Sequence, residues 1–153
     1  MKYSKGFTLI ELMVVVALIA IIATLATPSM IRFIQRSQVA EQSRSFVSFL
    51  QESRGQAVLL RHSKYPVNII AGTSGGSTNI GDNSAEWSPN SDRVNINIPT
   101  DADNFKYNLL GQTDMTGEAC YIITHKNNAT VGQVIILDRN GSTKVHNNTI
   151  TCP

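Results

Sequence analysis

The sequence has few residues of the kinds that build catalytic or metal sites. It contains three histidines and two cysteines, and none of the histidines has metal-motif spacing to another histidine or to a cysteine. It also lacks the Gly-x-Ser-x-Gly turn of serine hydrolases and the glycine-rich loops that bind nucleotide phosphates. We therefore predict no catalytic residue, no metal, no cofactor and no enzyme activity.

An excess of charge is also missing. The formal net charge is +2, from thirteen Lys and Arg and eleven Asp and Glu. Two of the thirteen are Lys2 and Lys5, so the rest of the chain holds eleven basic residues against the same eleven acidic ones. A large surface for nucleic acid needs a basic excess, and the body of the chain has none.

Ionisable residues are nearly absent from residues 7–27, where Glu11 is the exception. An apolar run of about 20 residues can span a bilayer and is longer than the core of most signal peptides. No Ala-x-Ala-like cleavage site follows it. Because Lys2 and Lys5 precede the run, the positive-inside rule places the N-terminus in the cytoplasm. The sequence predicts a single-pass inner-membrane protein with its polar part in the periplasm of a Gram-negative cell.

Glu11 needs a reason to be in an apolar segment, where an acid costs about 3 kcal/mol on insertion scales. The segment offers no cation to pair with it. Cleavage after Gly6 would create one, the α-amine of Phe7, and in an assembly this amine could meet the carboxylate of the next subunit. The alternative is a glutamate near the interface that extends to water.

The run Lys5-Gly6-Phe7-Thr8-Leu9-Ile10-Glu11 resembles the processing motif of type IV prepilins. The resemblance implies that prepilin peptidase cuts between Gly6 and Phe7 and methylates the new N-terminal Phe7. It also gives Glu11 an assembly role and places Pro28 where pilin helices commonly bend. Proline removes a helical hydrogen bond and clashes with the preceding turn, so a kink at Pro28 follows from its chemistry as well.

These features divide the chain into three parts. Residues 1–6 are predicted to be a leader peptide, and residues 7–28 a transmembrane and assembly helix. Residues 29–153 are predicted to be a head that lies in the periplasm, or outside the cell when in a pilus. The head begins with an amphipathic helix over 29–62, in which apolar residues recur at steps of three, four and seven: Val39, Phe46, Leu50, Ala57 and Leu60.

After residue 65 the apolar pattern changes to strict alternation, which indicates strands. Val94, Ile96 and Ile98 alternate with polar residues, and Asn140-Gly141 is typical of a hairpin turn. Residues 72–84 are rich in Gly, Ser and Asn and are predicted to be a flexible surface loop. The expected fold is α+β, a long N-terminal helix packed on an antiparallel sheet.

The two cysteines, Cys120 and Cys152, are an even count in a chain that leaves the cytoplasm, which favours a disulfide. The bond would fix a C-terminus that otherwise frays. Two buried free thiols are the alternative.

Two longer segments resemble the GspH/FimT/FimU group of minor pilins and pseudopilins. They are residues 46–70, at the junction of helix and strand, and residues 132–145, GQVIILDRNGSTKV. The resemblance implies a minor subunit near the tip of a type IV pilus or type II secretion pseudopilus. Such a subunit contacts other pilin or pseudopilin subunits and helps to initiate assembly.

Two other functions stay open at this point. Some FimT-like relatives bind DNA through a Gly-Arg-x-Arg turn, and residues 141–144 match it with one basic residue missing. Four residues are the candidate DNA contacts: Arg139, Lys144, His146 and Lys126. The other alternative is an adhesive tip subunit that binds a surface through residues 72–90, with Trp87 as a possible contact.

Overall fold

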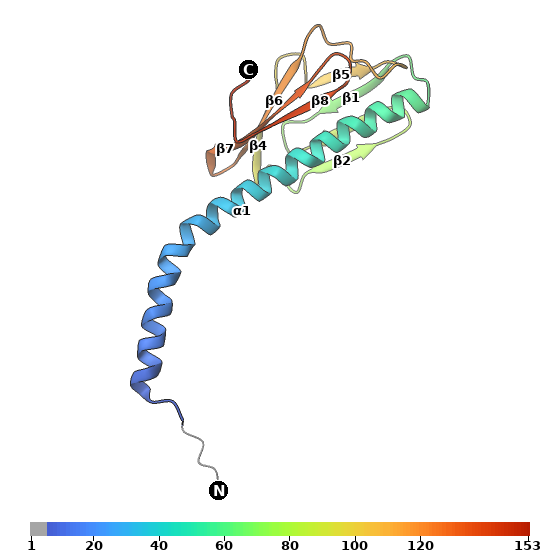
Figure 1. Cartoon of the computed structure of the whole chain (residues 1–153). Coiled ribbons are helices and arrows are strands. Elements are labelled where there is room, and N and C mark those ends of the chain that lie inside the picture. The colour runs from blue at the N-terminus through green and yellow to red at the C-terminus, as the bar shows by residue number, and fades with distance from the viewer. Residues whose placement is uncertain (1–5) are drawn as a thin grey trace. The chain divides into compact units, whose positions relative to one another are not determined.

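The computed structural model describes residues 6–153, without the side chains of residues 25–28 (Figure 1). It contains two compact units, Met1–Ile34 and Gln35–Pro153, which are taken in turn. Within residues 6–153 one helix and eight strands follow one another: α1 (Leu9–Leu59), β1 (Tyr65–Ile69), β2 (Ser77–Ile80), β3 (Ala85–Ser88), β4 (Val94–Asn97), β5 (Asn104–Tyr107), β6 (Ala119–His125), β7 (Asn128–Leu137) and β8 (Thr143–Asn147).

The first unit holds the start of α1. The Thr8 hydroxyl accepts a hydrogen bond of 3.3 Å from the Glu11 N–H, so Thr8 caps the helix, and Thr-x-x-Glu is the sequence of a capping box. Among the described residues, no single helix is apolar and long enough to cross a membrane; Leu9–Thr24 and Ser29–Leu59 pass together on length and composition alone. The side chain of Pro28 lies outside the described part, so the predicted kink stays a prediction.

In the second unit, the rest of α1 packs against the sheets through its predicted apolar face. Val39, Phe46, Leu50 and Ala57 are buried, as is Phe49, which the spacing did not single out.

The helix ends three residues before the predicted limit. Arg61 has a φ of 52°, and the His62 N–H donates to the Ala57 carbonyl. A residue in the left-handed conformation with this hydrogen bond is a common C-terminal cap of an α-helix. Leu60 therefore lies outside the helix and is 44% exposed, although the periodicity predicted it to be buried.

The strands form two four-stranded sheets, in the orders β2-β3-β1-β5 and β4-β6-β7-β8. The predicted α+β class is confirmed. The second sheet is antiparallel throughout. The first is mixed, because β1 pairs with β3 in parallel. Between β1 and β3 the chain passes through residues 72–84. These residues were predicted to be a flexible surface loop, but they contain the edge strand β2. The side chains of β2 are mostly exposed and do not alternate between buried and exposed.

An aromatic cluster joins the helix to both sheets. The ring of Phe46 lies 4.6 Å from that of Trp87 on β3 and 4.9 Å from that of Tyr121 on β6. The Trp87 indole N–H donates a 3.2 Å hydrogen bond to the Ser45 hydroxyl. Trp87 is therefore a core residue, and its polar atom is satisfied.

Two tyrosines of the core differ in how their hydroxyls are satisfied. The Tyr121 hydroxyl donates a 2.8 Å hydrogen bond to the Ala102 carbonyl, whereas the buried Tyr107 hydroxyl has no partner. Burial raises the pKa of both phenols; nearby Arg54 opposes the effect at Tyr107, while Tyr107 and Asp103 add to it at Tyr121.

These shifts predict a loss of stability at alkaline pH. An unfolded tyrosine titrates near pH 10, and the folded protein holds these two protons to higher pH. The two neutral, buried tyrosines therefore contribute their full stabilisation below about pH 10, and this contribution falls as the pH rises above that value. Tyr107→Phe should reduce this alkaline loss and change the free energy of unfolding at pH 7 by less than about 1 kcal/mol.

Tyr121→Phe is the matched variant, because it removes a hydroxyl that does have a partner. It should cost about 1–2 kcal/mol at pH 7, since the buried Ala102 carbonyl loses its donor. Urea unfolding of the full chain at pH 7 and pH 10.5, followed by circular dichroism, measures both effects. Equal costs at pH 7 for the two variants would contradict the assignment.

Candidate functional site

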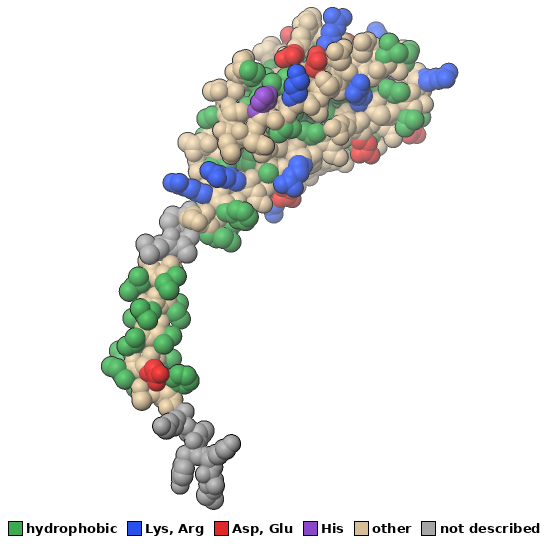
Figure 2. Space-filling view, viewed as in Figure 1, with side chains coloured by type: hydrophobic (Ala, Val, Ile, Leu, Met, Phe, Trp, Pro, Cys, Tyr) green, Lys and Arg blue, Asp and Glu red, His purple; other side chains and the backbone are tan. Residues whose placement is uncertain are grey.

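The predicted processing residues lie at the start of the described chain. Phe7 is 85% exposed, and a Cβ built on Gly6 would meet no atom within 4 Å. The fold itself therefore does not require glycine at this position. Glu11 is exposed, and its carboxylate has no ion-pair partner among the described residues. Figure 2 shows that the visible side chains of the first unit's helix are mostly apolar.

The four candidate DNA contacts are not gathered at one place. Lys144 and His146 lie on one face of β8, opposite Ile136 and Val134 of β7. Arg139 lies in the turn between these strands, while Lys126 lies in the turn at the other end of β7. Val134, which lies opposite His146, is six positions from the start of β7, a distance of about 20 Å. Ile136, opposite Lys144, and Arg139 lie farther along, so Lys126 is well separated from the other three.

The glycine of the proposed DNA-binding turn has a packing role. Gly141 has a φ of 74°, and a Cβ there would collide with the Gly111 carbonyl and the Arg54 side chain. The Arg54 Nε–H donates a 3.0 Å hydrogen bond to that same carbonyl. The turn is thus fixed against the end of α1, and this packing accounts for Gly141 without a nucleic-acid ligand.

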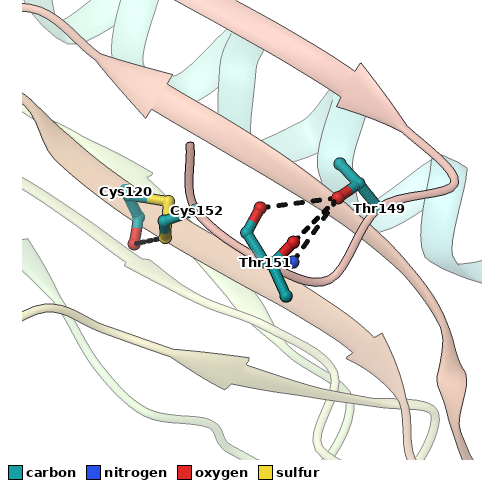
Figure 3. Close-up of a disulfide and its surroundings, with 4 residues drawn as sticks. All are labelled: Cys120, Thr149, Thr151 and Cys152. Atoms are coloured by element: carbon teal, nitrogen blue, oxygen red, sulfur yellow. Dashed lines mark hydrogen bonds between the residues drawn. A yellow bond between two sulfur atoms is a disulfide. The ribbon is translucent and has the colours of Figure 1, made fainter.

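The C-terminal tail crosses the outer face of the second sheet, where a disulfide joins Cys152 to Cys120 (Figure 3). This is the predicted pair. The side chain of Ile150 lies so close to Gly132 that a Cβ on this glycine would collide with it. Thr149 also accepts a 3.5 Å hydrogen bond from the Thr151 N–H. The tail is therefore held by packing, by a local turn and by a covalent bond.

A groove of about 680 Å³ lies between α1 and the edge of the second sheet. Ala40, Val47 and Val145 are its apolar lining residues, and Arg36 and Arg44 are its charged ones. No acidic side chain lines it. Ser43 also lines the groove, and its buried hydroxyl has no hydrogen-bond partner. Among the described residues no group of acidic, histidine or cysteine side chains is arranged to hold a metal.

Comparison with known proteins bears on both ends of the chain. Residues 1–27 match the family model of the prokaryotic N-terminal methylation motif. The fold is similar to that of the type IV minor pilin FimU of Pseudomonas aeruginosa. The TM-score is 0.58 at 13% sequence identity, over 76% of this chain and 93% of that one. The chain thus combines a prokaryotic N-terminal methylation motif with a type IV pilin-like fold. No curated protein sequence matches the pilin-like chain.

The groove of this pilin-like protein was missed by the sequence analysis. The helical pattern identifies the buried face of α1, on which Ser43 lies, but it does not indicate that Arg36 and Arg44 line a groove. The available signal was a serine on the buried face between two arginines, since a buried hydroxyl normally has a partner. The opposite side of the groove is formed by Gln133 of β7 and by Val145 and Asn147 of β8, and the pattern of a helix does not predict which strands lie beside it.

Proposed function

We propose that this pilin-like protein is a minor pilin or pseudopilin. In this proposal prepilin peptidase cuts after Gly6 and methylates Phe7. Residues 7–28 anchor the chain in the inner membrane, with the head, residues 29–153, in the periplasm. The subunit is then incorporated near the tip of a type IV pilus or a type II secretion pseudopilus, where it contacts other subunits and helps to initiate assembly.

The observation that carries this proposal is the acid at Glu11. Its carboxylate is exposed on an apolar helix and has no cationic partner among the described residues. The Thr8 hydroxyl accepts the hydrogen bond of the Glu11 backbone N–H, but it does not neutralise the charge of the Glu11 carboxylate. An unpaired acid in an apolar medium costs several kcal/mol, and the α-amine of a neighbouring subunit's Phe7 would remove this cost. Gly6, which the fold does not require, is consistent with recognition by a peptidase.

The two alternatives have less support. DNA binding needs several clustered cations, and the candidate residues are divided between the two ends of β7. An adhesive loop would need an exposed aromatic group, but Trp87 is 1% exposed. Neither arrangement favours a second function over the assembly role.

The proposal predicts a specific covalent state. Protein extracted from the inner membrane of its natural host should start at N-methylated Phe7, and its mass should be two hydrogens short of the reduced chain. Intact-mass and N-terminal peptide mass spectrometry measure both. A chain that still begins at Met1 in cells with active prepilin peptidase would contradict the proposal.

Glu11→Ala tests the assembly step by itself. We expect normal membrane insertion and cleavage, but incorporation into sheared fibres at least about tenfold lower, because a loss of about 1.4 kcal/mol already gives that factor. Glu52→Ala is the control, since it removes an exposed acid from the head part of the same helix. Wild-type incorporation of Glu11→Ala would contradict the pairing of amine and carboxylate.

A further inference from the structure

The edge strand β8 lies alongside the second unit's part of α1. At its start, Gly141 lies against Arg54, and at its end Asn147 and Asn148 share the groove with Arg36. Residues 141–148 of an extended chain cover about 24 Å, and helix residues 36–54 cover about 27 Å. The strand and the helix therefore run in opposite directions along the same length, with the groove between them.

The groove has an unused hydrogen-bonding edge. β8 pairs with β7 and is the last strand of its sheet. In an antiparallel pair, alternate N–H and C=O groups of the outer strand point away from the sheet. Such an edge is a template for an additional strand. The partly exposed Val145, on the face of β8 turned toward α1, gives the incoming strand an apolar surface.

The groove is also positively charged, and one polar group beside it lacks a hydrogen-bond partner. Arg36 and Arg44 are exposed and make no ion pair or hydrogen bond with any of the described residues. The Ser43 side chain, 1% exposed, lacks a hydrogen-bond partner although a buried hydroxyl usually has one. The two free guanidinium groups favour a ligand with anionic oxygen atoms.

The spacing of the two arginines indicates the form of that ligand. Arg36 and Arg44 are eight positions apart on the helix, a rise of about 12 Å. Two side chains four positions apart on a strand lie on the same face and are about 13 Å apart. A strand with carboxylates at those two positions would place the side chain between them over Ala40, which lies midway between the two arginines and is partly buried and apolar.

From these observations we infer that the groove binds an extended acidic segment of a partner polypeptide, which adds to β8 as a fifth strand. Its two carboxylates, four residues apart, pair with Arg36 and Arg44, and a small apolar side chain lies between them. The inference rests on residues of the head and goes beyond the proposed assembly role. It does not require cleavage after Gly6 or the pairing of Glu11.

The test is a binding measurement with the full chain in an uncharged detergent. The probe is a fluorescein-labelled nine-residue peptide of alternating threonine and valine, with two glutamates four positions apart on one face. Fluorescence anisotropy should report saturable binding that weakens with salt. Arg36→Gln and Arg44→Gln should each weaken binding about fivefold, whereas Lys106→Gln, which removes an exposed charge outside the groove, should not.

Strand pairing is tested with backbone-methylated peptides. Methylating every second nitrogen blocks one edge of the peptide, so one of the two possible methylation patterns should abolish binding and the other should not. Equal binding of both patterns would overturn the pairing with β8. Equal binding of a peptide with adjacent glutamates would overturn the match to the two arginines.

A second copy of the chain is the competing occupant. If the peptide does not bind and the oligomeric state changes in Arg36→Gln, the inference is overturned and a second copy of the chain is the occupant of the groove. Wild-type processing at Phe7 alongside absent peptide binding would leave the proposed function standing and reject this inference alone.

Discussion

Phe46→Ala is expected to lower the free energy of unfolding by about 3–5 kcal/mol. Phe46 is fully buried, and its ring contacts one aromatic residue from each sheet, Trp87 and Tyr121. The substitution therefore removes the group through which α1 packs on both sheets. The surrounding rings belong to different strands, so they are poorly placed to close the cavity, and collapse of the site should recover little of the loss.

The measurement is urea unfolding of the full chain in an uncharged detergent, followed by circular dichroism. Val58→Ala is the control, because Val58 lies on the same helix but is 42% exposed. This control should cost no more than about 0.5 kcal/mol. Similar losses for the two variants would show that Phe46 does not connect the sheets as the structure indicates.

Loss of the disulfide should have an effect of comparable size, about 3–4 kcal/mol in the chain-entropy model. The bond closes a loop with a sequence separation of 32 residues, and this loop contains the whole of β7 and β8. In Cys152→Ser the unfolded chain regains that loop entropy. The tail is also freed from the outer face of the sheet, where it holds Ile150 against Gly132.

Reduction of the wild-type protein provides the comparison for this variant. Dithiothreitol should lower the stability of the wild type to that of Cys152→Ser and leave the variant unchanged. A wild type that unfolds at the same urea concentration with and without the reductant would refute a stabilising role for the bond. Cys120→Ser should behave as Cys152→Ser does, since either change removes the same crosslink.

The sequence predicted the parts of the fold that depend on local pattern. Steps of three and four identified the face of α1 that is buried, because a helix repeats every 3.6 residues. Asn140-Gly141 identified the β7–β8 hairpin, because such a turn needs a positive φ. The two cysteines were paired by elimination. Each of these inferences uses residues that are close in sequence, or a set with only two members.

The remaining features depend on contacts between distant segments. The parallel pairing of β1 with β3 needs the chain to return past β2, and nothing in residues 72–84 marks an edge strand. Leu60 was predicted to be buried, but the left-handed turn at Arg61 ends the helix before this residue. Phe49 is buried although the spacing did not single it out. The groove combines α1 with β8, about a hundred residues later, so its arginines read as ordinary exposed charges in the sequence.

Trp87 also gives this protein a built-in optical reporter. It is the single tryptophan of the chain, and it lies in a dry environment between the helix residues Ser45 and Phe46. Indole emission shifts to longer wavelength when water reaches the ring, so one intrinsic signal reports whether α1 is seated on the first sheet. No dye or label is required, and the signal can be followed in detergent, in lipid vesicles or within an assembled fibre whose other subunits lack tryptophan.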